Sequence, residues 1–192
     1  MVWINENKNS EFQQFFDSEI IKESSGKCEF YYKIREWCNL KKLELLYRGS
    51  IDGKKSKDFH KKCDNKGATI TLYKNEKRYI FGGYNPISWA GDSSWIKNDA
   101  TFIFTLTNIH NTEPLKFPHK KGEDSFKNNS DSGPKFDDIY IEDNFEDKET
   151  TIHFPRGYLD TSNFGKSIFT GFKDSNITKI KIKEIEVFKV LW

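Results

Sequence analysis

Apolar residues in the first forty positions recur three and four residues apart, the spacing that places side chains on one face of a helix. The first stripe consists of Phe12, Phe15, Phe16 and Ile20. After the break at Ser24-Ser25-Gly26, a second stripe consists of Phe30, Tyr31, Ile34, Trp37 and Cys38. This pattern predicts two amphipathic helices within residues 1–39.

Beyond residue 40 the chain changes to short apolar segments between turn residues, which is typical of strands. We predict a strand over Leu43–Arg48 that stops at the turn residues Asp52-Gly53. A short helix is expected over Lys54–Asn65, with Phe59 and Cys63 on its inner face.

The middle of the chain favours antiparallel pairing. Residues 68–75 and 78–84 are predicted to form a hairpin, with Ala68, Ile70 and Leu72 on one face. Strict alternation in residues 101–108 predicts a half-buried strand, for which the segment at 114–118 is a candidate partner.

The second half of the chain contains a polar stretch and two more predicted strands. Residues 122–133 are rich in Gly, Ser and Asn and are expected to form a mobile surface loop, followed by a strand over Phe136–Asp143. Near the end, Ile180 and Ile182 alternate in one phase and Ile185 and Val187 in the other. A β-bulge at residues 183–184 would reconcile the two phases.

These elements predict a mainly β (α+β) fold, a two-sheet antiparallel β-sandwich with flanking short helices and an N-terminal helical extension. We divide the chain into N-terminal helices at 1–39 and a sandwich domain at 40–192. Ile, Leu, Val and Phe account for only 48 of 192 residues, and 17 of these are Phe. Aromatic rings are therefore expected to supply much of the core.

Charge, cysteine content and the lack of long apolar runs limit the partners and the cell compartment that we expect. The 31 Lys and Arg residues nearly balance the 29 Asp and Glu residues, which argues against nucleic acid as a partner. Three cysteines are too few for a disulfide framework, and we expect reduced thiols inside the cell. No apolar run is long enough to span a bilayer, and the start lacks a signal-peptide pattern.

Six motifs occur in a fixed order, namely LLYRGSIDG, FHKKCDNKGATITL, YIFGGYNPISW, DATFIFTL, GPKFDDIYI and IKEIEVFKV. Together they resemble the TLDc domain family over about residues 40–190. The Lys-rich composition, with 27 Lys against 4 Arg, is similar to that of protist members. The positions that carry the resemblance are Arg48, Asp52, Gly53, Phe59, Gly82, Gly83, Trp89, Gly133, Pro134, Glu184 and Glu186.

The resemblance implies a β-sandwich without an agreed catalytic activity. It also implies protection from oxidative stress and binding to the vacuolar proton-pumping ATPase. These properties place the chain in the cytoplasm, at endomembranes only through a protein partner, and suggest no cofactor. The oligomeric state stays open.

Cys63 and His60 are the one candidate for chemistry. Three residues apart on a helix, they could form a thiolate–imidazolium pair, the arrangement that makes a cysteine reactive. The helical periodicity instead favours an inert core thiol at Cys63, and one Cys with one His is at best half a zinc site. We assign no catalytic residue and no metal.

Other motif residues have mainly structural interpretations. Arg48 beside Asp52 is expected to form a buried ion pair that ties strand to helix, although an Arg at a strand end could also grip a partner's carboxylate. Gly82-Gly83 lacks the following helix of a phosphate loop, so we expect a bulge or close packing of a ring, Trp89 or Trp95.

Charged and aromatic residues supply a candidate partner surface. Seven carboxylates between Asp137 and Glu149 are interpreted as a solvated acidic face rather than a calcium site, with a basic counterpart around the short helix. Trp89 and Trp95 are expected in the core, with an exposed anchor as the alternative. The candidate partner surface comprises Lys54, Lys57, Lys61, Lys62 and Trp95.

We therefore favour a non-enzymatic, intracellular TLDc interaction module that docks on the vacuolar ATPase. One alternative is a thiol-based antioxidant enzyme that uses Cys63 with His60 as base. Another is a structural component of a larger assembly, in which the N-terminal helices make the contact.

Overall fold

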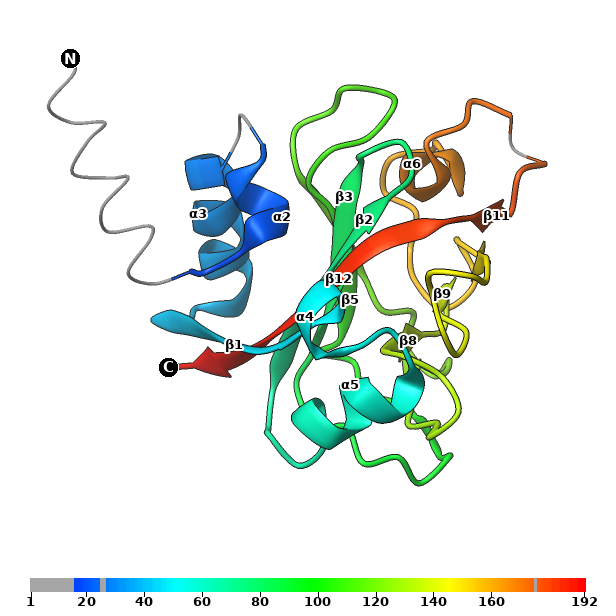
Figure 1. The fold of residues 1–192 in the computed structure, drawn as a ribbon. Helices are drawn as coiled ribbons and strands as arrows, with labels where there is room; N and C mark the ends of the chain where they lie inside the picture. The colour runs from blue at the N-terminus through cyan, green and yellow to red at the C-terminus, as the bar shows by residue number, and fades with distance from the viewer. Residues whose placement is uncertain (1–15, 25–26, 175) are drawn as a thin grey trace, which may run out of the picture.

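The computed structural model describes residues 16–24, 27–174 and 176–192, which form three layers (Figure 1). Helices α2 (Glu19–Lys22) and α3 (Lys27–Cys38) cover one face of a six-stranded sheet. A second six-stranded sheet covers its other face. The predicted antiparallel two-sheet sandwich is confirmed. The predicted stripe residues Phe12 and Phe15 lie outside the described residues.

The first sheet has the order β1-β12-β2-β3-β5-β6, and every pairing in it is antiparallel. Its strands are β1 (Lys42–Arg48), β12 (Ile182–Leu191), β2 (Thr69–Asn75), β3 (Ile80–Asn85), β5 (Phe102–Thr105) and β6 (Leu115–Pro118). The predicted hairpin is the pair β2–β3, and the segment at 114–118 does pair with β5. The register between β12 and β2 shifts between Ile182 and Glu184, which confirms the predicted bulge.

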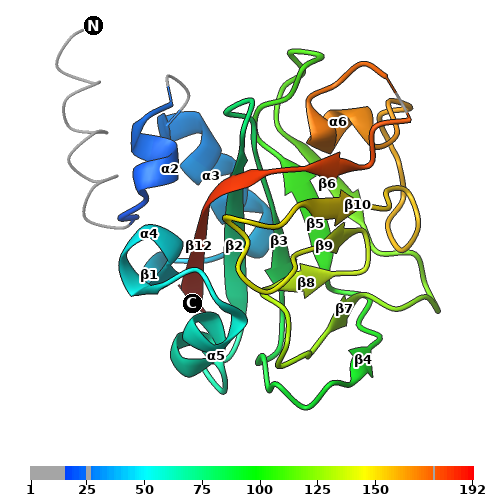
Figure 2. The ribbon, with the colours of Figure 1, turned by 45° about the vertical axis from the view of Figure 1, so that its right-hand side comes forward.

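The second sheet has the order β11-β10-β9-β8-β7-β4 and lies nearest the viewer in Figure 2. Its strands are β11 (Lys179–Ile180), β10 (Thr150–Ile152), β9 (Ile139–Tyr140), β8 (Lys135–Phe136), β7 (Phe126–Lys127) and β4 (Trp95–Ile96). Most of these strands are two residues long, so packing rather than ladder hydrogen bonds must hold this layer in place.

Two cores follow from the three layers. The core between the sheets is mainly aromatic, as expected from the composition, and includes Tyr73, Phe81, Trp89, Phe126, Phe136, Phe154 and Phe169. Helices α5 (Ser56–Cys63) and α6 (Ser167–Thr170) close its two ends (Figure 1). As predicted, Phe59 and Cys63 of α5 are both buried.

The helices α2 and α3 form the second core with the first sheet. Their buried residues Phe16, Ile20 and Ile34 join Leu72 and Phe188 of the sheet in one cluster. The helices thus pack on the sandwich and do not extend from it. Independent folding of residues 40–192 stays a prediction.

Three local predictions are wrong. The strand expected to be half-buried is buried on both faces, because Phe102 and Phe104 face the helices and Ile103 faces the second sheet. The expected mobile loop at 122–133 contains β7 and the fully buried Phe126. The strand predicted over Phe136–Asp143 is two short strands, β8 and β9, on either side of a turn.

No helix among the described residues is long and apolar enough to cross a membrane.

Candidate interaction surface

Arg48 does not pair with Asp52 as predicted. Its Nε lies 2.6 Å from Oε1 of Glu186 on the neighbouring strand β12, and both side chains are buried. Asp52 instead accepts the backbone N–H of Arg48 and pairs with Lys62. The ion pair therefore ties strand to strand, because Arg48 and Glu186 are register partners across β1 and β12.

Glu186 also anchors the start of helix α2. The Ser18 hydroxyl donates to its Oε2 at 2.5 Å and the backbone N–H of Glu19 donates to its Oε1 at 3.0 Å. Burial raises the pKa of Glu186, whereas the hydrogen bonds from Ser18 and Arg48 lower it. The buried carboxylate therefore depends on Arg48 to stay charged, and it joins β1, β12 and α2 at one point.

The motif glycines lie where a side chain has no room. A Cβ on Gly83 would lie 2.4 Å from the Phe136 ring, and one on Gly82 would lie 2.0 Å from the carbonyl oxygen of Thr71. The prediction of close ring packing is right, but the rings are Phe136 and Phe104, not Trp89 or Trp95. Gly83 lets the second sheet approach the first.

Other motif positions also make contacts that hold the fold. Gly53 has a φ of 111°, and its carbonyl accepts the Tyr47 hydroxyl. The carbonyl of Pro134 accepts the buried Tyr73 hydroxyl, and Glu184 accepts the backbone N–H of Ser50. A Cβ on Gly133 would lie 2.8 Å from Ile141. The positions that carry the resemblance are thus mainly structural.

Cys63 and His60, the candidate thiol pair, have different surroundings. The Cys63 side chain is fully buried, and burial raises the pKa of its thiol well above the ordinary value. His60 is held elsewhere, since its Nδ1 lies 2.8 Å from Asp64 and its Nε2 lies 2.8 Å from the Asn129 carbonyl oxygen. A buried thiol with a raised pKa is a poor nucleophile.

The three cysteines are free thiols. In the part of the chain that the structure describes, no group of three His, Cys, Asp or Glu side chains is placed to bind a metal ion.

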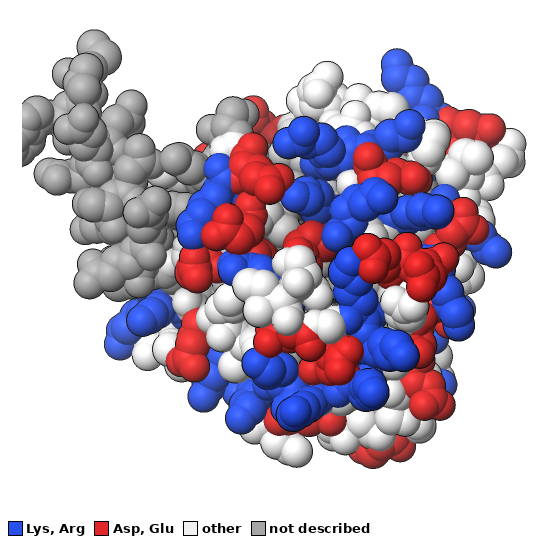
Figure 3. All heavy atoms as spheres, viewed as in Figure 1, with Lys and Arg blue, Asp and Glu red and all other residues white. Residues whose placement is uncertain are grey.

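The predicted acidic and basic faces contact each other. Lys54 of the basic set forms an ion pair with Glu146, and Asp143 accepts the backbone N–H of Ser56. Figure 3 accordingly shows Lys and Arg side chains interspersed with Asp and Glu. Lys57, Lys61 and Lys62 remain exposed on α5, so that part of the candidate surface is available to a partner.

Two residues of the predicted acidic face are not on the surface. Asp137 and Asp138 are buried, which contradicts a solvated face at this point. Asp138 accepts three backbone N–H groups, from Arg156, Gly157 and Tyr158 at 2.8, 3.1 and 3.0 Å. Its carboxylate thus fixes the loop after β10.

Burial raises the pKa of Asp138 to about 6, although these backbone hydrogen bonds lower it. An unfolded Asp has a pKa near 3.9, so the folded state binds this proton more tightly. The stabilisation from Asp138 is therefore complete below about pH 4 and is lost as the pH rises to about 6. Relative to Asp138→Asn, wild type should lose roughly 2–3 kcal/mol of unfolding free energy across this range. Urea denaturation at several pH values measures it, and parallel pH profiles would contradict it.

Trp89 and Trp95 have opposite environments. Trp89 is fully buried, as expected, and its Nε1 donates to the Thr69 hydroxyl at 3.0 Å. Trp95 is 37% exposed, which contradicts the predicted core position and fits the alternative of a surface anchor. Two lysine side chains make cation–π contacts with Trp95. The Nζ atoms of Lys127 and Lys135 lie 5.2 and 5.8 Å from the centroid of its ring.

These two lysines were not predicted as part of a site from the sequence, although a signal was present. Lys127 follows the buried Phe126, and Lys135 precedes the buried Phe136. In a strand such neighbours point to opposite sides, so both lysines are on the outer face. The polar composition of residues 122–133 predicts a loop there, and this composition masks the alternation.

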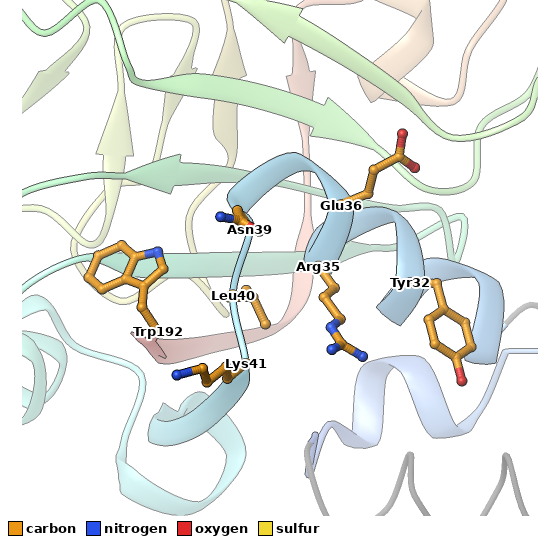
Figure 4. Close-up of a pocket in the computed structure, with 7 residues that line it drawn as sticks. All are labelled: Tyr32, Arg35, Glu36, Asn39, Leu40, Lys41 and Trp192. Carbon is orange, nitrogen blue, oxygen red and sulfur yellow. The ribbon is translucent and has the colours of Figure 1, made fainter.

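A shallow groove of about 660 Å³ lies where α3 ends near the last strand (Figure 4). Figure 4 shows Trp192 at one end and Tyr32 at the other, with Arg35 between them. Trp192 is 60% exposed, and its Nε1 donates to the Cys38 carbonyl at 3.3 Å. The groove combines exposed rings with charges of both signs and provides a second candidate contact surface. Its lining residues are Tyr32, Arg35, Glu36, Asn39, Leu40, Lys41 and Trp192.

Nearly the whole chain matches the model of one protein family. The family model described as the TLDc domain matches residues 12–191. The chain belongs to the TLDc domain family. The match includes the helices α2 and α3, so these helices belong to the TLDc region that the family model defines.

A search of curated proteins finds no match to this TLDc chain. TLDc domains are generally linked to oxidation resistance and act as protein-interaction modules, generally without catalytic activity. The family membership therefore directs attention to the exposed surfaces of the sandwich.

Proposed function

We propose that this TLDc domain is a non-enzymatic module in the cytoplasm that docks on the vacuolar proton-pumping ATPase. Regulation of the pump by this docking would link the chain to oxidation resistance. The proposal for this partner comes from the resemblance to TLDc proteins that bind the pump. Family membership over residues 12–191 supports the more general role of an interaction module.

The burial of Cys63 carries the non-enzymatic part of the proposal. A thiol that reduces peroxide must expose a thiolate to its substrate. The Cys63 thiol is instead enclosed beside Phe59 and Tyr47 in the core between the sheets, with a raised pKa. His60, the candidate base, has partners at both ring nitrogens. The exposed rings and lysines of the surface fit docking better than this pair fits catalysis.

The test compares wild type with Cys63→Ala in two assays. The intact proteins are used to recover partners from extract of the cell of origin, read by mass spectrometry, and the pure proteins are tested for peroxide consumption. We expect both proteins to recover ATPase subunits equally and neither to consume peroxide catalytically. Asp92→Asn, a change at an exposed loop residue, is the control variant, and it should behave like wild type in both assays.

Two results would overturn the proposal in different ways. Peroxide turnover by wild type that disappears in Cys63→Ala would establish the thiol enzyme. Recovery of other proteins without ATPase subunits would leave an interaction module and remove the pump as its partner.

A further inference from the structure

Aromatic and cationic side chains form a cluster on the outer face of the second sheet. The inward residues Phe126, Phe136, Ile139 and Ile152 of β7, β8, β9 and β10 are fully buried in the core between the sheets. Their neighbours within the strands, Lys127, Lys135 and Tyr140, therefore point outward. Figure 2 shows these four strands side by side. We call the outward set the cationic-aromatic cluster, and it consists of Trp95, Lys127, Lys135, Tyr140, His153 and Arg156.

The rings and cations of this cluster are in direct contact. Lys135 Nζ lies 3.8 Å from the centroid of the Tyr140 ring, and the Trp95 and Tyr140 centroids are 6.2 Å apart. Arg156 donates to the Tyr140 hydroxyl at 3.3 Å, and His153 lies edge-on to the same ring, with a centroid separation of 4.5 Å. The cluster is therefore continuous from β4 through β7, β8 and β9 to the segment that follows β10.

The positive charge of the cluster is only partly neutralised. Within the described residues neither Lys127 nor Lys135 forms an ion pair, whereas Arg156 Nε lies 3.4 Å from Asp137. Burial and then the charge of Lys127 lower the pKa of Lys135, so the two ammonium groups repel each other. Burial and then Arg156 lower the pKa of His153, which is therefore mainly neutral at pH 7. An anion beside the two lysines would relieve this repulsion.

We propose that the cationic-aromatic cluster binds a short acidic peptide segment of a partner protein. Carboxylates of the segment would pair with Lys127, Lys135 and Arg156, and its intervening side chains would pack on Trp95 and Tyr140. Charged contacts around a desolvated aromatic anchor are typical of protein interfaces. The proposal is independent of whether the partner is the vacuolar ATPase.

The surroundings favour a short peptide over an extended polyanion. The exposed carboxylate of Glu142 acts on Lys135, so a long nucleic acid or a flat anionic membrane would also meet this negative charge. The formal charge of the whole chain is only +2, which gives little long-range attraction for such polymers. A segment of a few residues can pair with the cations and avoid Glu142.

The test uses a synthetic hexaglutamate peptide and the intact protein labelled for NMR. Titration at low salt should shift the Trp95 indole N–H and the backbone amides of residues 126–140. It should also raise the pKa of Lys135. High salt should weaken the binding, because the contacts are charged. Shifts confined to the lysines of α5 or to the groove around Trp192 would overturn the proposal.

Charge-reversal variants test the site through their affinity for the peptide. Lys127→Glu/Lys135→Glu should weaken peptide binding about tenfold or more, and Lys127→Gln/Lys135→Gln should weaken it less. The matched control is Lys42→Glu/Lys183→Glu, at two exposed lysines of β1 and β12 in the first sheet, which should bind the peptide within about twofold of wild type. Cooperative thermal unfolding near the wild-type midpoint verifies that each variant folds. If wild type and both Lys127/Lys135 variants bind the peptide with equal affinity, the cluster is not the binding site.

Two other ligands are tested with the same proteins. A single-stranded oligonucleotide and phosphatidylserine vesicles are each titrated against wild type and the two charge-reversal variants. We expect both to bind more weakly than the peptide. Tighter binding of either one that depends on Lys127 and Lys135 would overturn the assignment of an acidic peptide as occupant.

Discussion

Replacing Arg48 with Met is expected to lower the free energy of unfolding by about 3–5 kcal/mol, because it leaves a buried carboxylate without its cation. The uncompensated group is Glu186, which is fully buried and 2.6 Å from Arg48 Nε. Arg48 also donates to the backbone carbonyl of Asp17 at 2.8 Å. The variant therefore loses contacts to β12 and to the segment that begins α2.

Denaturant unfolding followed by circular dichroism measures this loss. Lys33→Met is the matched control, since the Lys33–Glu36 pair is exposed and should contribute less than about 1 kcal/mol. The double variant Arg48→Met/Glu186→Leu should recover part of the loss, because no buried charge remains. An Arg48→Met protein as stable as the control would show that the buried pair does not hold these elements together.

The pH dependence of Arg48→Met follows from the same ion pair. Burial raises the pKa of Glu186, and loss of Arg48 removes a group that lowers it. A carboxyl group whose folded pKa is raised loses stabilisation as the pH rises through that value. The deficit of Arg48→Met relative to wild type should therefore be larger at neutral pH than in mild acid.

Replacing Trp89 with Ala is expected to cost about 3–5 kcal/mol, the usual range for a large ring removed from a core. The Trp89 ring is fully buried and meets three other rings edge-on, with centroid distances of 5.5 Å to Phe59, 5.2 Å to Phe126 and 5.8 Å to Phe136. These contacts join α5 to the second sheet. The variant also leaves the buried Thr69 hydroxyl without the N–H that it accepts.

Trp95→Ala is the matched control for Trp89→Ala. Both variants remove one indole, but Trp95 is 37% exposed and its change should cost no more than about 1 kcal/mol. Thermal and urea unfolding of the two variants in parallel give the comparison. Similar losses for both, or a larger loss for Trp95→Ala, would contradict the assignment of Trp89 to the core and Trp95 to the surface.

Local alternation and turn residues were sufficient to predict much of the fold. The hairpin β2–β3, the pairing of β5 with β6 and the inward position of Phe59 and Cys63 all follow from the period of apolar residues. The change of phase near the end predicted the register shift after Ile182, because one strand cannot bury both phases on one face.

Features that depend on distant segments were not predictable from local patterns. Ile103 and Phe104 are adjacent, and only the presence of a layer on each side of the sheet explains why both are buried. Arg48 has the acidic residues Glu44 and Asp52 four residues away on either side, yet its partner Glu186 is 138 residues away. Pairing across strands decides such contacts.

The candidate surface was predictable only in part for the same reason. Trp95 was selected as a possible partner contact, but the lysines on its ring come from β7 and β8 and not from α5. Short strands of two residues carry too little alternation to be recognised. Their assembly in the second sheet brings the cationic-aromatic cluster together.

The central claim is that this TLDc domain acts through its surface and not through the chemistry of Cys63. The most direct test is the affinity of the purified chain for purified vacuolar ATPase, measured for wild type and Cys63→Ala side by side. The account predicts saturable binding with the same Kd for both proteins. Absence of binding by wild type, together with peroxide consumption that requires Cys63, would contradict it.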